Sequence, residues 1–271
     1  MKAAAFGYER PKDLAEALKL LSTSESKVLA GGQSLGPMLN LRVVQPALLV
    51  DLRGIEELKS FSENKDSVTL GACITHAQIE DGRVPDPTGP TIGFMREIAS
   101  NIAYRAVRNH GTVGGSLAHA DPAADWPSAL MLLGATALIA GPGGRRELPV
   151  ERFLTGLFET DLRNEEILVA VRVPRRSVAA RFAYWKFCRK AGEFAQAIGA
   201  ALHDPERGVA RAVIGATRGA PHLLADAKTL LAKPEAQTLL HAVDTAGLGA
   251  DAYNRQLHAV ALRRAIEQLA A

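Results

Sequence analysis

The chain contains few cysteines for its size. Among its 271 residues only Cys73 and Cys188 carry thiols, and the two lie far apart in the sequence. Two cysteines exclude a disulfide-rich scaffold and a self-contained four-cysteine zinc or iron–sulfur site. We therefore expect two reduced thiols, as is typical of a cytoplasmic protein.

The chain also lacks long hydrophobic runs and an excess of charge of one sign. Its longest apolar stretch, residues 129–140, contains Gly134 and is shorter than the roughly 18 residues that span a bilayer. The N-terminal segment has too few apolar residues for a signal peptide. Lysine and arginine number 32 against 29 aspartates and glutamates, without a basic run, so nothing indicates a nucleic-acid partner. We expect a soluble cytoplasmic protein with no membrane span.

Hydrophobic periodicity predicts an α+β protein in two parts. The polar, weakly patterned residues 174–180 mark the expected boundary. The first part has apolar residues at helical spacing after Pro11, and several short apolar runs typical of strands. Its expected helices cover 11–21, 75–81, 93–100 and 124–133, and its expected strands cover 27–30, 47–52, 67–72, 135–140 and 166–173. In the second part, strands over 182–188, 195–203 and 209–216 are expected to precede helices over 221–232, 234–246 and 252–269.

The first candidate binding motif is glycine-rich and follows the expected strand over 27–30. It reads AGGQSLG from Ala30 to Gly36. Glycines permit positive φ and let backbone N–H groups surround a small anion, and the Ser34 hydroxyl adds a hydrogen-bonding group. The segment has the spacing neither of the GxGxxG dinucleotide fingerprint nor of the P-loop. It therefore predicts either a cradle for a diphosphate or a plain tight turn.

The same residues match the GxSxG pattern of a nucleophile elbow around Ser34. An elbow normally lies deep in a parallel sheet, whereas only one expected strand precedes Ser34. A serine hydrolase is thus a remote alternative, in which replacement of Ser34 by alanine would abolish turnover. The candidate partners of Ser34 in that case are Asp121 or Asp125 with His203 or His222.

The second candidate motif, RNHGTVGGSLAHADPAAD, covers residues 108–125. Gly114 and Gly115 are expected to free backbone N–H groups beside the hydroxyls of Thr112 and Ser116. Asp125 has the chemistry to accept hydrogen bonds from sugar or ribityl hydroxyls. Two separate glycine-rich anion loops suit a long cofactor that contains a diphosphate.

Two other interpretations of the second motif stay open. His119, Asp121 and Asp125 are potential metal ligands, although Pro122 intervenes and no further ligand is obvious. Alternatively, Asp121 or Asp125 caps the helix that follows.

Three motifs in this order resemble the FAD-binding, or medium, subunit of the molybdenum hydroxylases, the family of xanthine dehydrogenase and carbon monoxide dehydrogenase. They are AGGQSLGPMLNLR from Ala30, VRNHGTVGGSLAHADPAADWP from Val107 and FCRKAGEFA from Phe187. The resemblance extends from Phe6 to the C-terminal helices. It implies an α+β fold with a two-lobed, vanillyl-alcohol-oxidase-like (PCMH-type) FAD-binding domain and a C-terminal domain of a three-stranded antiparallel sheet and helices. The implied domains cover 1–175, with a small lobe over about 1–55 and a large lobe over about 56–175, and 176–271.

The resemblance also implies which residues bind FAD, and it implies neither a catalytic side chain nor a metal ligand. Lys186 would lie near the flavin, where a cation helps to hold a reduced, anionic ring. Phe194 would face the isoalloxazine ring or pack in the core, and Asp125 would bind ribityl or ribose hydroxyls. Ile102 would lie near the cofactor, and Leu168 along the flavin or its chain. The diphosphate would lie between Ala30, Gly31, Gly32, Gln33, Ser34 and Leu35 on one side and Thr112, Gly114, Gly115 and Ser116 on the other.

The sequence departs from the family pattern in one stretch. Glu193 and Phe194 stand where an Asp and a Tyr are common, which leaves the tuning of the flavin open. The cysteines are too few for an iron–sulfur cluster in this chain. No histidine of the matched loops is an obvious site for a covalent flavin link, so we expect FAD to be bound non-covalently.

The resemblance implies an oxidoreductase subunit that relays electrons. A large partner subunit would hold molybdopterin, a small partner subunit would hold two [2Fe–2S] clusters, and two such heterotrimers would form a dimer. FAD in this chain would pass the electrons to NAD, a quinone or another external acceptor. A stand-alone FAD-dependent oxidase of the same fold and a non-enzymatic flavin- or nucleotide-binding module remain as alternatives. The substrate, the redox potential and the stoichiometry stay undetermined by the sequence.

Overall fold

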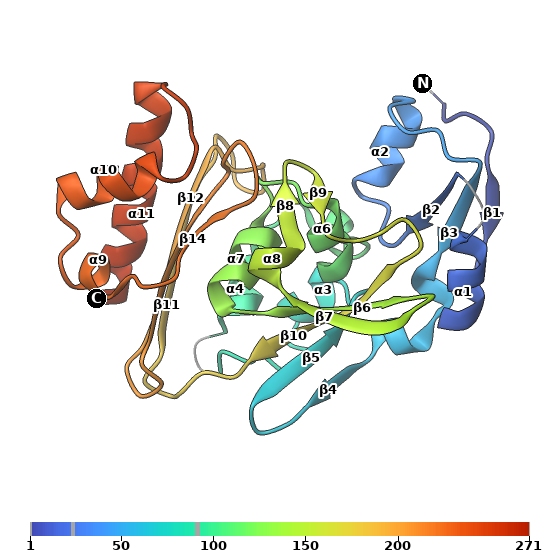
Figure 1. The fold of residues 1–271 in the computed structure, drawn as a ribbon, viewed down its shortest axis with the longest axis horizontal. Coiled ribbons are helices and arrows are strands. Elements are labelled where there is room, and N and C mark those ends of the chain that lie inside the picture. Colours follow the sequence, from blue (N-terminus) through green and yellow to red (C-terminus); the bar gives the residue numbers. More distant parts are fainter. Residues whose placement is uncertain (1, 23–24, 90–92, 271) are drawn as a thin grey trace.

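The fold consists of three main β-sheets that lie side by side with their helices. The computed structural model describes residues 2–22, 25–89 and 93–270. Figure 1 shows a small sheet near the N-terminus, a larger sheet in the middle and a third sheet with the C-terminal helices at the opposite end. This mixture of helices and sheets confirms the predicted α+β class.

The N-terminal sheet is parallel, with the strand order β1-β3-β2. Helix α1 begins later than predicted, because Asp13 and not Pro11 sets its start: the Asp13 carboxylate accepts a hydrogen bond from the backbone N–H of Glu16. Strand β1 consists of exposed residues, so no hydrophobic pattern predicted it. The elements are β1 Gly7–Glu9, α1 Leu14–Leu21, β2 Ser26–Leu29, α2 Leu35–Asn40, β3 Leu48–Asp51 and the 3₁₀ turns Leu52–Gly54 and Glu56–Lys59.

The middle sheet is antiparallel, with the strand order β4-β5-β10-β6-β7. The predicted strands β5, β6 and β10 form its interior, because their apolar residues are buried. Strands β4 and β7 lie at the two edges and are largely exposed, and neither was predicted. The strands are β4 Phe61–Glu63, β5 Ser67–Gly71, β6 Thr136–Gly141, β7 Gly144–Pro149 and β10 Ile167–Pro174, with a separate short pair β8 Leu154–Gly156 and β9 Glu159–Thr160.

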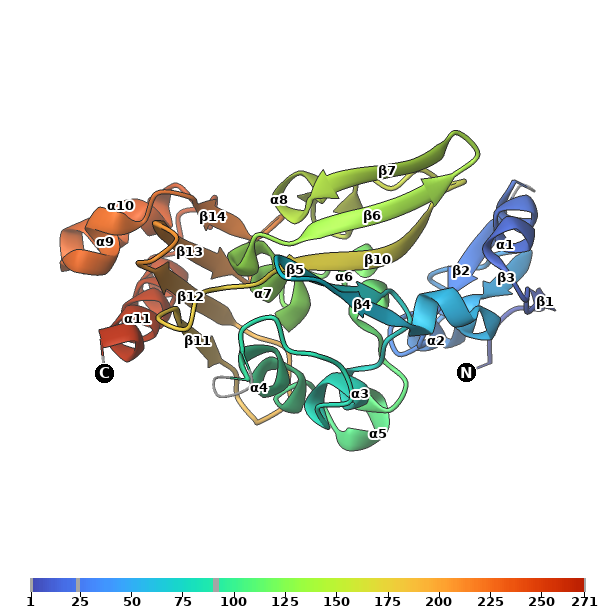
Figure 2. The same cartoon turned by 90° about the horizontal axis from the view of Figure 1, so that it is seen from below.

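Six helices accompany the middle sheet in the described part of the chain, and Figure 2 shows α3, α4 and α5 grouped on one side. Helix α3 begins with the capping box of Thr75 and Gln78, which confirms the helix predicted there. Every residue of α7 is buried, so this helix forms the centre of the core. The helices are α3 His76–Glu80, α4 Phe94–Ser100, α5 Arg105–Arg108, α6 Val113–His119, α7 Asp125–Leu133 and α8 Val150–Phe153.

The C-terminal sheet has four antiparallel strands in the order β11-β12-β13-β14, so the expected number of three is wrong. The predicted helix over 221–232 begins as strand β14, whose His222–Leu224 pairs with Ala212, Val213 and Ile214. A three-residue strand carries too little periodicity to be recognised; its pairing with β13 decides its conformation. The elements are β11 Arg181–Phe187, β12 Ala197–Asp204, β13 Val209–Gly215, β14 His222–Leu224, α9 Lys228–Ala232, α10 Ala236–Asp244 and α11 Ala252–Ala270.

The C-terminal sheet is covered on both faces. Helix α7 packs against β12 and β13 on one face, and α11 packs against β11 and β12 on the other. Gly199 in β12 permits the close approach of α11, because a Cβ atom there would lie 2.4 Å from the backbone of Ala261. The two predicted domains therefore share α7 as a common packing element.

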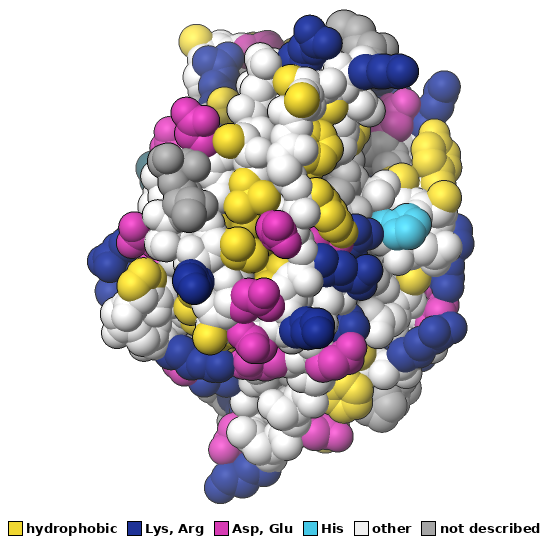
Figure 3. Space-filling view, turned by 90° about the vertical axis from the view of Figure 1, so that its right-hand side faces the viewer, with side chains coloured by type: hydrophobic (Ala, Val, Ile, Leu, Met, Phe, Trp, Pro, Cys, Tyr) yellow, Lys and Arg dark blue, Asp and Glu magenta, His cyan; other side chains and the backbone are white. Residues whose placement is uncertain are grey.

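The surface carries both signs of charge. Figure 3 shows Lys and Arg side chains interspersed with Asp and Glu on the face nearest the N-terminal sheet, with hydrophobic side chains grouped between them. Within the described residues, every helix falls short of the length and hydrophobicity that a bilayer crossing requires.

Candidate functional site

The glycine-rich segment 30–36 connects β2 to α2. Among the described residues, none of the N–H groups of residues 31–35 donates a hydrogen bond within the protein. Gly32 has a φ of 71°, a value that favours glycine. Consecutive N–H groups that point the same way in a turn form a concave site for an anion. Within the first motif, the structure thus favours the diphosphate cradle over the plain turn.

The second glycine-rich segment differs from the expected loop, because it forms the first turn of α6. The Thr112 side chain caps this helix and accepts a hydrogen bond from Gly115 N at 3.0 Å. Gly114 N donates to Ala72 O, also at 3.0 Å. The prediction that Gly114 and Gly115 free their N–H groups for a ligand is therefore wrong. Gly114 instead lets α6 approach the end of β5, since a Cβ atom at this position would lie 2.4 Å from Ala72 Cβ.

The two glycine-rich segments lie directly against each other, although the sequence separates them widely. A Cβ atom at Gly31 would lie 2.0 Å from the carbonyl oxygen of His110, and one at Gly115 would lie 3.4 Å from Ala30 Cβ. This contact joins the N-terminal sheet to α6. The residues predicted to surround a diphosphate are thus brought together, with the free N–H groups contributed by residues 31–35.

Asp125 lies at the first turn of α7 and has two partners from strand β11. Its Oδ2 accepts a hydrogen bond from Lys186 Nζ at 2.9 Å, and its Oδ1 accepts one from the Tyr184 hydroxyl at 3.1 Å. The Asp125 side chain is only 6% exposed, and that of Lys186 is 10% exposed. Burial raises the pKa of Asp125, while the positive charge of Lys186 opposes this rise. Lys186 is thus a buried, paired cation and not a surface lysine.

The alternatives for the acidic residues of the second motif find no support. Ala124 is the N-cap of α7, so neither Asp121 nor Asp125 caps it. Asp121 instead accepts a hydrogen bond from Ala123 N in a local turn, and the His119 ring packs against Phe158. Within the residues that the structure describes, no three His, Cys, Asp or Glu side chains are arranged to hold a metal ion.

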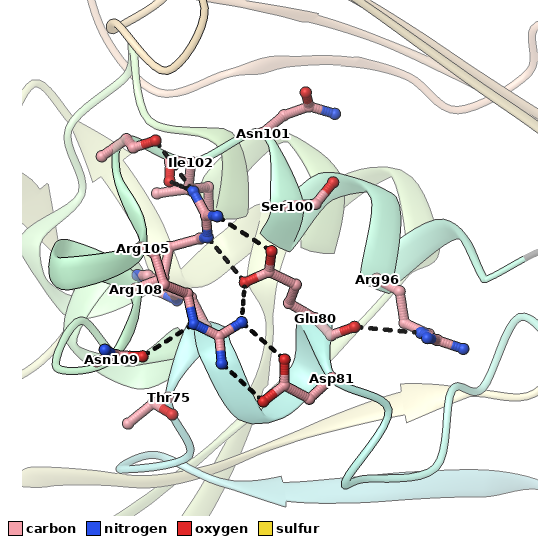
Figure 4. A network of polar contacts seen from close by, with 12 residues as sticks. Thr75, Glu80, Asp81, Arg96, Ser100, Asn101, Ile102, Arg105, Arg108 and Asn109 are labelled. Atoms are coloured by element: carbon pink, nitrogen blue, oxygen red, sulfur yellow. Dashed lines mark hydrogen bonds and ion pairs between the residues drawn. The ribbon is translucent and has the colours of Figure 1, made fainter.

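The loop that contains Ile102 is held by an arginine cluster (Figure 4). Arg108 forms a bidentate ion pair with Glu80, with N–O distances of 2.8 and 3.0 Å, and its Nη1 donates to the carbonyl oxygens of Ile102 and Ala103 at 2.9 and 3.0 Å. The hydrogen bond from Arg108 lowers the pKa of Glu80. Arg105 forms a second bidentate pair with Asp81. These pairs fix the path of the chain after α4, where the half-buried Ile102 packs against the core.

The loop that contains Phe194 touches the same region. Ala103 N donates to Gly192 O at 3.1 Å, and Ala195 N donates to Ala123 O at 3.2 Å. Phe194 is 63% exposed, so the core-packing interpretation of this side chain is wrong. Leu168, by contrast, is buried in the central hydrophobic cluster on β10. Their predicted contacts with a flavin stay predictions.

The structure contradicts the hydrolase interpretation of Ser34. This residue precedes α2 in the N-terminal lobe, whereas His203 and His222 belong to β12 and β14 of the C-terminal sheet. Figure 1 shows these elements in different parts of the molecule, well separated by the middle sheet. A serine nucleophile needs its histidine base within hydrogen-bond reach.

Sequence reasoning missed Tyr184, Arg108 and Glu80. Tyr184 stands two positions before Lys186 in a strand, so the alternation of side chains placed both on one face and could have indicated their common partner. For Arg108 and Glu80 the sequence contains no comparable signal, since their pairing depends on how α3 and α5 pack.

A family model described as the FAD binding domain in molybdopterin dehydrogenase matches residues 4–176. The chain belongs to this family. The medium chain of carbon monoxide dehydrogenase from Afipia carboxidovorans is 32% identical over 97% of this chain and 96% of its own length. The beta subunit of caffeine dehydrogenase from a Pseudomonas species is 35% identical over 76% of this chain and 70% of its own length. In the structure of reconstituted CO dehydrogenase from Oligotropha carboxidovorans, one chain aligns with a TM-score of 0.89 at 30% identity and 99% coverage of both chains.

The family match confirms the resemblance carried by the three motifs, and with it FAD as the cofactor. The chain is an FAD-binding subunit of oxidoreductase type. The N–H groups of residues 31–35, which donate no hydrogen bond among the described residues, fit this cofactor, because its diphosphate is a compact anion that requires several donors.

Proposed function

We propose that this chain is the electron-transfer subunit of a molybdenum-containing hydroxylase or dehydrogenase. It would receive electrons from the [2Fe–2S] clusters of a small partner subunit and pass them to an external acceptor. A large partner subunit would hold molybdopterin and carry out the oxidation of the substrate. The observation that carries this proposal is the direct contact between the segment 30–36, with its free N–H groups, and the capped turn 112–116.

FAD, when bound, supplies the redox chemistry, since it accepts electrons and transfers them to a second carrier. The protein contributes binding and position. We assign the diphosphate to the N–H groups of Gly31, Gly32, Gln33, Ser34 and Leu35. Thr112, Gly114, Gly115 and Ser116 would form the opposite wall through packing and the Ser116 side chain. Ile102, Leu168, Lys186 and Phe194 would border the flavin end.

We also propose that residues 1–175 form a two-lobed FAD domain of the PCMH type and that 176–271 form the C-terminal domain of the molybdenum hydroxylase flavoproteins. The parallel sheet that ends at β3 and the antiparallel sheet that begins at β4 support a division into lobes near residue 55. The glycine-rich segments meet where these lobes touch.

The relatives support a multi-subunit assembly and do not identify its substrate. Two relatives named for different substrates, carbon monoxide and caffeine, resemble this chain at 32% and 35% identity. We infer that substrate choice lies in a partner subunit, as expected for a chain that relays electrons. We expect a cytoplasmic dimer of heterotrimers, with NAD, a quinone or another carrier as the acceptor.

The first test is the visible absorption spectrum of the purified chain before and after heat denaturation. We expect a flavin spectrum, with FAD released into the supernatant and identified by chromatography. A colourless chain that also fails to bind added FAD would contradict the proposed function. Flavin that stays with the denatured protein would contradict non-covalent binding alone.

A further inference from the structure

Strand β11 has a free edge. It is the outermost strand of the C-terminal sheet, and Figure 2 shows it at one margin of that sheet. Its backbone pairs with β12, and within the described ranges no backbone group of residues 181–186 bonds to the backbone of any other element. Alternate N–H and C=O groups of an edge strand point away from its sheet. Strand β11 can therefore form backbone hydrogen bonds with one further strand.

An apolar groove lies between β11 and α11. Gly199 seats α11 closely on β12, so the helix covers β11 incompletely and the side chains of Trp185 and Phe187 stay half-buried. The groove has a volume of about 190 Å³. Its residues on α11 recur at intervals of three and four positions and therefore share one face of the helix. The lining includes Trp185 and Phe187 of β11 and Tyr253, Leu257, Val260 and Arg264 of α11.

The segments that form the groove are basic. Neither residues 175–192 nor residues 252–266 contain an aspartate or a glutamate, whereas both contain several arginines. Arg181 and Arg189, at the two ends of β11, are exposed, and the Arg264 guanidinium lies 4.7 Å from the centre of the Trp185 ring. A second copy of this chain would bring the basic strand against itself, and like charges on facing strands repel. The charge pattern therefore favours an acidic occupant.

We propose that β11 and this groove form a docking site for an extended, acidic segment of a partner subunit. The segment adds to the sheet beside β11 through backbone hydrogen bonds. Because alternate residues of a strand face the same side, its apolar side chains enter the groove at every second position. Its carboxylates pair with Arg181, Arg189 and Arg264. The inference rests on the proposed assembly with partner subunits and is independent of FAD.

The first test is photo-cross-linking in the full complex, purified through a tag on this chain. A benzophenone-bearing amino acid replaces Tyr253, which lines the groove and is 68% exposed. Mass spectrometry then identifies the cross-linked peptide. We expect a segment of a partner subunit in which acidic residues stand among alternating apolar ones. Hydrogen exchange at alternate amides of β11 should also be about tenfold slower or more in the complex than in the isolated chain, because the added strand supplies their acceptors.

The second test compares charge reversal at two neighbouring arginines of α11. Arg264 lines the groove, whereas Arg263 lies outside that lining and is 50% exposed. Arg264→Glu should weaken binding of the cross-linked partner about tenfold or more, because it places a negative charge against an acidic segment. Arg263→Glu is the matched control and should change the dissociation constant by less than about twofold. Both variants should retain bound FAD, which the visible spectrum measures.

A cross-link to a second copy of this chain, to a basic segment or to no partner would overturn the inference. Equal effects of Arg264→Glu and Arg263→Glu, or unchanged exchange along β11, would do the same. If Arg264→Glu fails to fold, Tyr253→Asp takes its place in the comparison, because an exposed position tolerates the change. A complex that docks through the groove but contains no flavin would instead defeat the proposed function and leave the docking site intact.

Discussion

Single residues at the two glycine-rich segments control how closely the lobes approach. Gly31 is the extreme case, because a side chain there would overlap the His110 backbone and not a flexible side-chain end. Gly36, five positions later in the same segment, has nothing within 4 Å of its hypothetical Cβ atom. A comparison of substitutions at Gly31 and at Gly36 therefore separates the effect of disturbing the lobe contact from the general effect of replacing a glycine.

Gly31→Ala should lower the stability of the folded chain by about 1–3 kcal/mol, because the added methyl group forces the 30–36 segment away from His110. It should also weaken FAD binding, since the N–H groups of residues 31–35 would move. Gly36→Ala lies inside α2 and should be neutral or stabilising by about 0.5–1 kcal/mol. Thermal denaturation and FAD titration measure both. Equal effects of the two variants would refute the lobe-contact explanation.

His76 makes the chain sensitive to acid. The ring is 5% exposed and accepts a hydrogen bond from Trp126 Nε1 at 3.0 Å, and burial lowers its pKa from 6.5 to about 4. Its unfolded form therefore binds a proton at a higher pH than its folded form. The stability contributed by neutral His76 is fully present above pH 6.5 and is lost as the pH falls toward 4.

Over this pH interval His76 should account for a loss of roughly 3 kcal/mol in the free energy of unfolding. The Asn side chain in His76→Asn retains an acceptor for Trp126 but does not titrate. The free energy of unfolding of this variant should therefore fall less between pH 6.5 and 4 than that of the unchanged chain. Chemical denaturation at several pH values gives the difference. Parallel pH profiles for the two proteins would show that His76 is not the sensitive group.

At the scale of elements, the short helix α5 is held by ion pairs more than by apolar contact. Helix α5 has no buried residue, and its Arg108 bridges to Glu80 at the end of α3 and to the carbonyl oxygens of the 102–103 loop. The Arg108 and Glu80 side chains are 12% and 20% exposed, so solvent screens this pair less than a surface pair. The position of the loop that contains Ile102 depends on this ion pair between Arg108 and Glu80.

Arg108→Lys should cost about 2 kcal/mol, because a lysine cannot reproduce the bidentate pair and the two carbonyl contacts together. The amide of Ala103 should exchange with solvent faster, since its loop loses two anchors. Arg83→Lys is the control, because Arg83 is 69% exposed and forms one peripheral contact with Asp81. Hydrogen exchange and thermal denaturation should show little change in the control; unaltered exchange at Ala103 in Arg108→Lys would contradict the anchoring role.

At the scale of the whole molecule, α7 belongs to both domains. Arg176 and Arg211 donate hydrogen bonds to its C-terminal carbonyl oxygens, at Leu133 and Met131 with distances of 2.5 and 2.9 Å. Gly215 in β13 lies against Ser128 of α7. Removal of the C-terminal sheet would thus expose one face of the central helix and leave the Met131 carbonyl oxygen without its donor Arg211.

The full chain should therefore unfold in a single calorimetric transition, and a fragment that ends at residue 176 should bind FAD weakly and expose hydrophobic surface. Dye binding and calorimetry on both chains measure this. Two separate transitions in the full chain, or a fragment as stable as the full chain, would show that the domains are independent.

Local patterns in the sequence determined the elements whose burial follows from their own periodicity. The wholly buried α7, the strands β5, β6 and β10 and the α+β class were predictable, because neighbours within a few positions decide them. The glycine motifs identified the family, and the family match confirmed FAD. The exposed edge strands β1, β4 and β7 escaped prediction because they bury no apolar face.

Only the tertiary structure decided what the polar and glycine residues contact. It placed Gly31 against His110, assigned Gly114 to the packing of α6 on Ala72, and paired Asp125 with Tyr184 and Lys186. Each of these contacts joins segments that are distant in the chain. Sequence periodicity reports which face of an element is buried, whereas the partner on that face depends on the packing of the whole fold.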